Sequence, residues 1–303
     1  MLIEPRTDWK ERETPGEAAR VEALTAQLVS MQQTVSAAEG KGRALHRKQV
    51  LGLNATLEVL GDLPAHARHG IFESPGTRDA LVRLSNGAAK RQGDAVPDVR
   101  GFALKVLGVE GPSALGSGTT DCQDILCINA SRFAFPSGID FLEFVVAMGR
   151  SPGAALWYML GRYGFGAFGR LSALKKGISK PFSGFATETF HSTNPLACGA
   201  HAMKLRLSPT HGQAPGAQPL DLAEDVAARL RKGPLTFDLQ AQFFVSEAAT
   251  PIENADQDWA EADAPFVTVA RLVLPQQDPA SAEGRATAAR CEGERFDPWR
   301  ALL

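Results

Sequence analysis

The stretch GRALHRKQVLGLNATLEV, residues 42–59, joins the end of a predicted helix to a predicted strand. Over residues 50–59 apolar and small polar residues alternate, which indicates a strand with one buried face. At its head His46 follows Arg43 by three residues. His46 either only marks the change from helix to strand, or is an acid/base imidazole at the mouth of a β-barrel, with Arg43 beside it for an anion. The stretch alone leaves both interpretations open.

The rest of the chain supplies elements around this strand. Apolar residues at helical spacing predict a helix over 15–40 that must pack on another part of the protein. Further helices are predicted over 139–149, 152–171 and 222–231, the last capped by Asp221. At least seven segments have strand patterns, which favours a closed antiparallel barrel; they are 50–59, 80–86, 102–107, 123–129, 202–207, 235–245 and 266–274.

The strand over 80–86 carries a second candidate group. Period two places Leu81, Arg83 and Ser85 on one face and Val82 and Leu84 on the other. A polar face of this kind is either solvated or turned into a barrel, where the arginine would need an anion. In the central apolar segments we expect Trp157, Phe165 and Phe168 to be core residues. The lysine-bearing run 171–181 is expected to be a solvated loop.

Composition excludes several classes of protein. The chain has 303 residues, 44% hydrophobic and 22% charged, with a formal net charge of −2. This balance argues against a nucleic-acid binder. Since no apolar run reaches about 18 residues, no membrane span is expected, and the charged N-terminal sequence does not have the pattern of a signal peptide. The four cysteines lack metal-ligand spacing and are expected to be free thiols in a reducing cytoplasm.

An ordered set of motifs resembles the haem catalase superfamily, most closely its small bacterial catalase-like proteins. The resemblance runs from about residue 10 to the end of the chain. Its main landmarks are Arg43-x-x-His46, Val82-Arg83-Leu84-Ser85-Asn86-Gly87, Asp98-x-Arg100-Gly101-Phe102-Ala103-x-Lys105, Phe133 and Phe141 eight residues apart, Phe190-His191-Ser192-Thr193-Asn194-Pro195, and Phe296-Asp297-Pro298-Trp299.

The resemblance implies an α+β fold, a catalase-like antiparallel β-barrel of about eight strands with surrounding helices. We expect an N-terminal helical arm over 1–41 and a barrel domain over 42–303. It further implies a haem-dependent oxidoreductase that decomposes hydrogen peroxide or organic hydroperoxides, as part of a response to oxidative stress. Catalases assemble, so a homo-oligomer is possible.

By the same resemblance each candidate residue has a role around haem b. His46 is the distal acid/base and Asn129 the amide that assists it, while Ser85 orients the imidazole. Arg43 and Arg83 pair with the haem propionates. Phe133 and Phe141 line the porphyrin.

Two departures from the family pattern limit these expectations. The distal segment reads Cys127-Ile128-Asn129-Ala130-Ser131, with one asparagine where catalases have two, so Ile128 is the other candidate for the functional position. Such a change would weaken hydrogen peroxide dismutation more than haem binding, and would favour either peroxidase activity or the rearrangement of organic hydroperoxides, as in the allene oxide synthase branch of the superfamily. The chain also stops before the helix that carries the proximal tyrosine in catalases, so no metal ligand is assigned and poor haem binding is expected.

Two alternatives belong to other functional classes. The first is a haem-free catalase-like barrel that binds an apolar ligand or a protein, which the missing proximal tyrosine favours. The second is a structural partner in an oligomer, which only the amphipathic N-terminal helix suggests.

Overall fold

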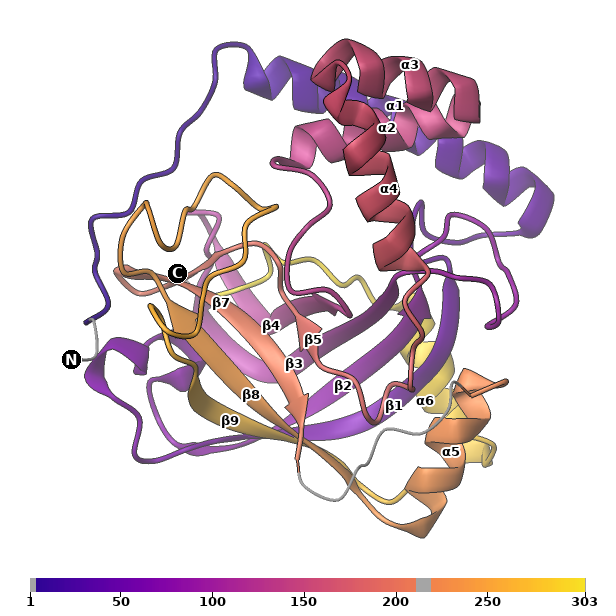
Figure 1. Ribbon diagram of the computed structural model, residues 1–303. Helices are drawn as coiled ribbons and strands as arrows, with labels where there is room; N and C mark the ends of the chain where they lie inside the picture. Colours follow the sequence, from indigo (N-terminus) through magenta and orange to yellow (C-terminus); the bar gives the residue numbers. More distant parts are fainter. Residues whose placement is uncertain (1–3, 211–218, 303) are drawn as a thin grey trace.

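A closed antiparallel β-barrel is the centre of the computed structural model, which describes residues 4–210 and 219–302 (Figure 1). Around the ring the strands follow the order β5-β4-β3-β2-β1-β9-β8-β7, and β5 closes it by pairing with both β4 and β7. A ninth strand, β6 (Leu196–Cys198), pairs with β7 outside the ring. The eight strands of the ring are β1 (Lys48–Val59), β2 (Gly76–Asn86), β3 (Arg100–Pro112), β4 (Thr119–Ile128), β5 (Phe190–His191), β7 (His201–Pro209), β8 (Leu235–Phe243) and β9 (Val267–Leu274). The predicted barrel is confirmed.

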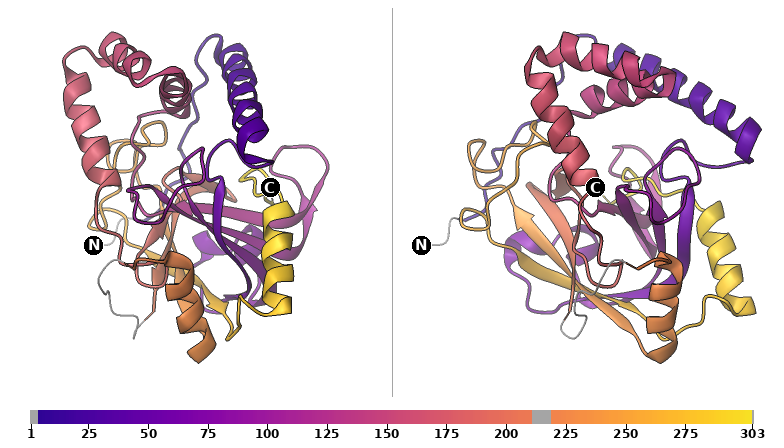
Figure 2. Two further views of the ribbon diagram at one scale, coloured as in Figure 1. Left: turned by 90° about the vertical axis from the view of Figure 1, so that its right-hand side faces the viewer. Right: turned by 45° about the vertical axis from the view of Figure 1, so that its right-hand side comes forward.

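Helices surround the barrel on two sides. Figures 1 and 2 show the first four helices gathered above it, while α6 lies along the outside of β1. Serine side chains cap α2 and α3, and the predicted Asp221 cap of α5 accepts from the amides of Ala223 and Glu224. The α-helices are α1 (Glu17–Glu39), α2 (Gly138–Arg150), α3 (Pro152–Tyr163), α4 (Gly166–Ile178), α5 (Leu222–Lys232) and α6 (Ala282–Gly293); two short 3-10 turns, Ala65–Ala67 and Gly70–Phe72, follow β1.

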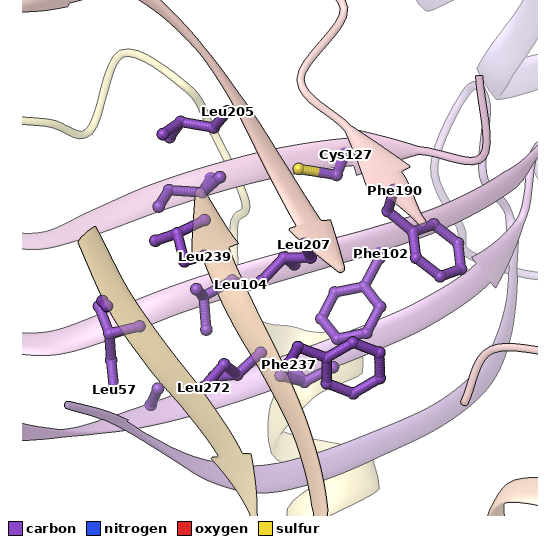
Figure 3. Packing of buried hydrophobic residues seen from close by; sticks show 14 of the residues in the cluster. Leu57, Phe102, Leu104, Cys127, Phe190, Leu205, Leu207, Phe237, Leu239 and Leu272 are labelled. Atoms are coloured by element: carbon purple, nitrogen blue, oxygen red, sulfur yellow. The ribbon is translucent and has the colours of Figure 1, made fainter. Parts of the chain in front are cut away.

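The barrel interior is filled by apolar side chains from every long strand. Figure 3 shows the aromatic end of this core, where the ring of Phe102 lies 5.2 Å from that of Phe190 and 5.4 Å from that of Phe237, measured between centroids. Leucines such as Leu57, Leu104 and Leu272 fill the remainder. The barrel is therefore a packed core, and the candidate site residues must lie elsewhere.

Strand β2 shows which of its faces is buried in the barrel. Ala80, Val82 and Leu84 belong to the interior core, so Leu81, Arg83 and Ser85 point outward from the barrel wall. The alternation was predicted correctly, but the interpretation that Arg83 looks into the barrel is wrong. The outward face is nevertheless buried, because other segments cover it.

Helix α6 is the segment that covers the outside of β1 and β2. The pairing of β1 with β2 shifts register between Gln49 and Leu51, a bulge that leaves both Gln49 and Gly52 on the outer face. Gln49 donates to the carbonyl of Ala288 in α6 at 2.9 Å. A Cβ at Gly52 would lie 2.7 Å from the Cβ of Cys291, so glycine is needed here for α6 to pack so closely.

Two expectations for the central helices are wrong. The run 171–181, predicted as a loop, lies largely in α4. Trp157, Phe165 and Phe168, predicted as core residues, are exposed by 76%, 93% and 56%. Other apolar residues of this region form its core instead. They include Phe135, Phe144 and Met159, which belong to a separate buried cluster beneath the exposed side.

The four cysteines are buried and free, as expected. None of the helices in the described part of the chain combines the length and apolar character needed to cross a bilayer.

Candidate functional site

His46 lies immediately before β1, in a backbone conformation that is unusual for a residue with a side chain. Its φ of 51° is left-handed, and backbone bonds hold it there. The amide of His46 donates to the carbonyl of Gly87 at 2.9 Å, and its carbonyl accepts from Arg83 at 3.0 Å. The imidazole is thereby presented to the outer face of β2, where Nδ1 lies 3.0 Å from the hydroxyl oxygen of Ser85.

Gly101 on β3 provides the space for this imidazole. It pairs with Ser85 across the sheet, and a Cβ at this position would lie 2.5 Å from Nδ1 of His46 and 2.7 Å from Oγ of Ser85. Any larger residue would therefore displace the ring. Gly101 was quoted in the motif, but its role as the floor beneath His46 follows only from the register of β2 and β3.

The environment keeps the imidazole neutral. Burial, together with the smaller effect of the nearby guanidinium groups of Arg83 and Arg43, lowers the pKa of His46 to about 4. If Nδ1 donates its hydrogen to Ser85, the unprotonated nitrogen is Nε2, which is then a base at neutral pH. The arrangement can accept and return a proton at that atom.

Two arginines converge beside His46 on one carboxylate. Glu292, near the C-terminal end of α6, accepts from Arg43 at 3.0 Å and from Arg83 at 2.9 Å through the same oxygen. Nε of Arg83 donates to this oxygen as well, at 3.2 Å. Arg43 also donates to the carbonyl of Glu294 at 2.8 Å. The sequence predicted an anion for these arginines, and the structure supplies one from a residue that sequence reasoning missed.

A third arginine holds the loop that carries His46. The Arg47 side chain is fully buried and donates to the carbonyl of Arg43 at 3.0 Å and to the hydroxyl of Ser36 at 3.0 Å. It also donates to the carbonyl of Gly40. Arg47 therefore ties the end of α1 to the turn before β1, which fixes the position from which His46 projects.

The distal amide is not placed against the imidazole in the manner the resemblance implies. The side-chain oxygen of Asn129 accepts from the backbone amide of Arg100 at 2.8 Å, so it is engaged with the start of β3. Ile128 pairs with Gly101 and shares the outward direction of Ser85. An apolar side chain therefore occupies the strand position next to the floor of the site.

The predicted porphyrin-lining aromatics form a unit of their own. Phe133 and Phe141 pack against each other with ring centroids 4.7 Å apart, and they belong to the cluster beneath α2, α3 and α4. The same cluster contains both tyrosines of the chain. Tyr158 donates to the carbonyl of Asp140 at 3.1 Å, and burial raises the pKa of each phenol, so neither has the character of a phenolate ligand.

A separate cavity of about 210 Å³ lies further around the barrel, beyond β4. Its basic lining residues include Lys204, whose pKa burial lowers to about 8, and His191, whose pKa burial lowers to about 4. Arg206 is paired with Glu261 at 2.6 Å at its edge. The motif that starts at Phe190 pointed to this region, but the sequence did not indicate a cavity.

Among residues 4–210 and 219–302 no group of three or more His, Cys, Asp or Glu side chains is placed to hold a metal ion. Whether the site suits the haem that the resemblance implies depends on Arg43, Arg83 and His46. The imidazole has the chemistry of a base, and the two guanidinium groups have that of a carboxylate-binding pair. The carboxylate position is filled by Glu292, so a propionate would have to replace or share it.

Comparison with known proteins bears on the fold of the chain. No protein-family model matches the chain. A catalase-related peroxidase from Mycolicibacterium paratuberculosis (strain ATCC BAA-968 / K-10) is 26% identical over 290 residues, which cover 88% of this chain and 85% of the relative.

Solved catalases have the same architecture. A bacterial catalase aligns with a TM-score of 0.63 at 16% identity over 95% of this chain, and a fungal catalase with 0.66 at 17% over 98%. Catalase A from Saccharomyces cerevisiae aligns with 0.62 at 15% over 98%. The chain spans 56%, 59% and 62% of the lengths of these three proteins. The chain therefore has the catalase-like fold that the resemblance predicted.

Proposed function

We propose that this protein is a haem-dependent oxidoreductase that decomposes peroxides, with His46 as its acid/base. The observation that carries the proposal is the imidazole held 3.0 Å from Ser85 on the outer barrel wall, beside two converging arginines. A neutral ring with one nitrogen fixed by a hydroxyl is suited to proton transfer at the other nitrogen. The relative named as a catalase-related peroxidase supports the same class of reaction.

In this proposal the protein's own residues have four tasks. Nε2 of His46 takes a proton from one peroxide oxygen and returns it to the other as that oxygen leaves. Ser85 holds Nδ1 and so keeps the tautomer in which Nε2 is the base. Gly101 has no side chain and so leaves space for the imidazole ring. Burial, helped by the positive charge of Arg83 and Arg43, keeps the imidazole unprotonated before it acts.

Haem b is the proposed cofactor, and when bound it would supply the iron at which the peroxide O–O bond is broken. Arg43 and Arg83 would hold its carboxylates, with Phe133 and Phe141 as the proposed aromatic contacts. Asn129 remains a proposed partner of the substrate only if its side chain leaves the Arg100 amide.

The substrate we favour is an organic hydroperoxide rather than hydrogen peroxide. Ile128 lies on the outward face next to Gly101, where an amide would be expected in a catalase. An apolar side chain there provides contact for a carbon chain and removes a hydrogen-bond donor from a small, polar peroxide. A cytoplasmic location, homo-oligomer formation and a role in the response to oxidative stress complete the proposal.

The second candidate is a catalase-like barrel that works without haem, as a protein-binding module. Glu292 favours it, because this carboxylate already neutralises the two arginines. The filled barrel interior argues against the version of this idea in which an apolar ligand is bound inside.

Titration of the purified chain with haem tests the proposal. Because neither tyrosine of the chain has the character of a phenolate ligand, we expect weak binding, with a Soret band that saturates only in excess haem and haem that is lost during gel filtration. In the loaded protein, His46→Asn should lower the rate of reaction with an alkyl hydroperoxide by about 10²–10⁴-fold, the usual contribution of acid/base catalysis. Asn is chosen because it tolerates a left-handed backbone.

Matched controls separate the two candidates. His66→Asn alters a histidine at the opposite end of β1 and should leave the rate unchanged. Absence of any saturable Soret band would favour the haem-free module. Haem binding with an unchanged rate in His46→Asn would show that the histidine is only structural.

A further inference from the structure

The segment 150–180 has a charge composition unlike the rest of the protein. It contains no aspartate or glutamate, although the whole chain has a formal net charge of −2. Its basic residues are Arg150, Arg162, Arg170, Lys175, Lys176 and Lys180. This segment forms α3 and α4, and the left view of Figure 2 shows α4 at the edge of the molecule.

Helix α4 separates its buried and exposed residues cleanly. At about 100° per residue, Ala167, Leu171 and Leu174 fall on the side that packs on the cluster beneath. The opposite side is exposed and carries two kinds of residue. It consists of Phe165, Phe168, Gly169, Ser172, Ala173, Lys175 and Lys176.

Phe165 is the most exposed large apolar residue of the described chain. It lies in the turn between α3 and α4, flanked by Gly164 and Gly166, and 93% of its surface is accessible. Gly164 has a φ of 55°, which lets the chain turn sharply there. Together with Phe168, 56% exposed one helical turn away, it forms a projecting aromatic tip.

The lysines supply free positive charge on the same exposed side, about two helical turns beyond Phe168. Arg162 and Arg170 are paired with Asp140 and Asp256 at 2.8 Å each. By contrast, no ion pair involves Lys175, Lys176 or Lys180 within residues 4–210 and 219–302, and the two in α4 are exposed on the aromatic side. The face therefore carries aromatic residues at one end of α4 and uncompensated cations toward the other.

We propose that this face, Phe165 and Phe168 with Lys175 and Lys176, docks on a membrane surface rich in anionic phospholipids. Phenylalanines at a projecting tip can enter the boundary between headgroups and acyl chains, while lysines contact phosphates around it. Free positive charge with no acidic residue in the segment is complementary to such a surface. The proposal is independent of haem binding, and it would bring the barrel to a source of lipid hydroperoxides.

Co-sedimentation of the full chain with vesicles tests the proposal. Vesicles of phosphatidylcholine with about 30% phosphatidylglycerol should bind the protein, and pure phosphatidylcholine vesicles should bind it far less. Binding should weaken as NaCl rises from about 0.05 to 0.5 M, because free charges are screened. Lys175→Glu with Lys176→Glu should lower the partition coefficient about twentyfold or more.

Phe165→Ser with Phe168→Ser should lower the partition coefficient about tenfold or more, because two aromatic rings would no longer be buried. Leu115→Ser with Trp299→Ser, which replaces two other exposed apolar residues, should bind as the unchanged chain does. Lys90→Glu with Lys232→Glu is the control for the charge change. Unchanged circular dichroism and melting temperature show that each variant is folded.

Three results would overturn the proposal. They are absence of binding to the anionic vesicles, equal losses in the test and control variants, and a dimer in light scattering that the Phe165→Ser and Phe168→Ser pair converts to a monomer. The last result would assign the face to a second copy of this chain.

Discussion

The two faces of strand β2 differ in what their side chains do. Inward, Val82 and Leu84 pack in the apolar core of the barrel. Outward, Arg83 and Ser85 are equally buried, yet each is bonded to a polar partner, Glu292 and His46. The comparison teaches that the inner face maintains the fold, while the outer face uses burial to set charge and protonation.

The largest loss of stability should come from a substitution on the inner face of the barrel. Phe102→Ala removes a fully buried ring that contacts Phe190 and Phe237, and should lower the free energy of unfolding by about 3–5 kcal/mol. Phe168→Ala, which removes a ring from the exposed side of α4, should change it by less than about 0.5 kcal/mol. Urea denaturation measures both, and similar losses in the two variants would contradict the assignment of the core.

Acid should lower the free energy of unfolding through His46 on the outer face, because the apolar side chains of the inner face of β2 do not titrate. The pKa of His46 is about 4 when folded and near 6.5 when unfolded, so the unfolded chain binds more protons between these values. Its contribution to stability is thus complete above pH 6.5 and is lost as the pH falls toward 4, by at most about 3 kcal/mol. His191 should behave in the same way.

Denaturation between pH 7 and 4 checks this expectation. His46→Asn and His191→Asn should each flatten the decline in unfolding free energy, and the double variant should flatten it further. A decline that neither variant alters would mean that carboxyl groups alone govern this range.

A smaller loss of stability is expected when the carboxylate that pairs with both arginines is removed. Glu292→Gln leaves Arg83 buried with less compensation, and should lower the free energy of unfolding by about 1–3 kcal/mol, since Glu292 is partly exposed. Added phosphate or acetate should restore part of the loss by entering the position between the guanidinium groups. Glu283→Gln, at the exposed first turn of α6, makes the same charge change and should show no such anion dependence.

The smallest effect tests the orientation of the imidazole. Ser85→Ala removes one hydrogen bond and should lower the free energy of unfolding by about 0.5–1.5 kcal/mol. The sharper readout is the nitrogen chemical shift of His46, which should change from one tautomer to a mixture. Ser172→Ala, on the exposed side of α4, should leave both quantities unchanged. A shift of His46 that is insensitive to Ser85 would mean that the backbone alone orients the ring.

Sequence by itself determined the elements and part of the site. The alternation of residues 50–59 and 80–86 predicted β1 and β2, because the side-chain period of a strand is local. The ordered motifs predicted, through resemblance, that His46 and Ser85 would meet across 39 residues, and they do.

Only the tertiary structure decided which face of β2 is inside, since alternation divides a strand without saying which side the barrel encloses. Glu292 meets Arg83 across 209 residues, through the packing of α6 on Gly52, and no local pattern records that contact. The exposure of Phe165 was likewise decided by tertiary structure. Hydrophobicity measures the free energy that a residue gains by burial, whereas the packing of α3 and α4 decides which residues are buried.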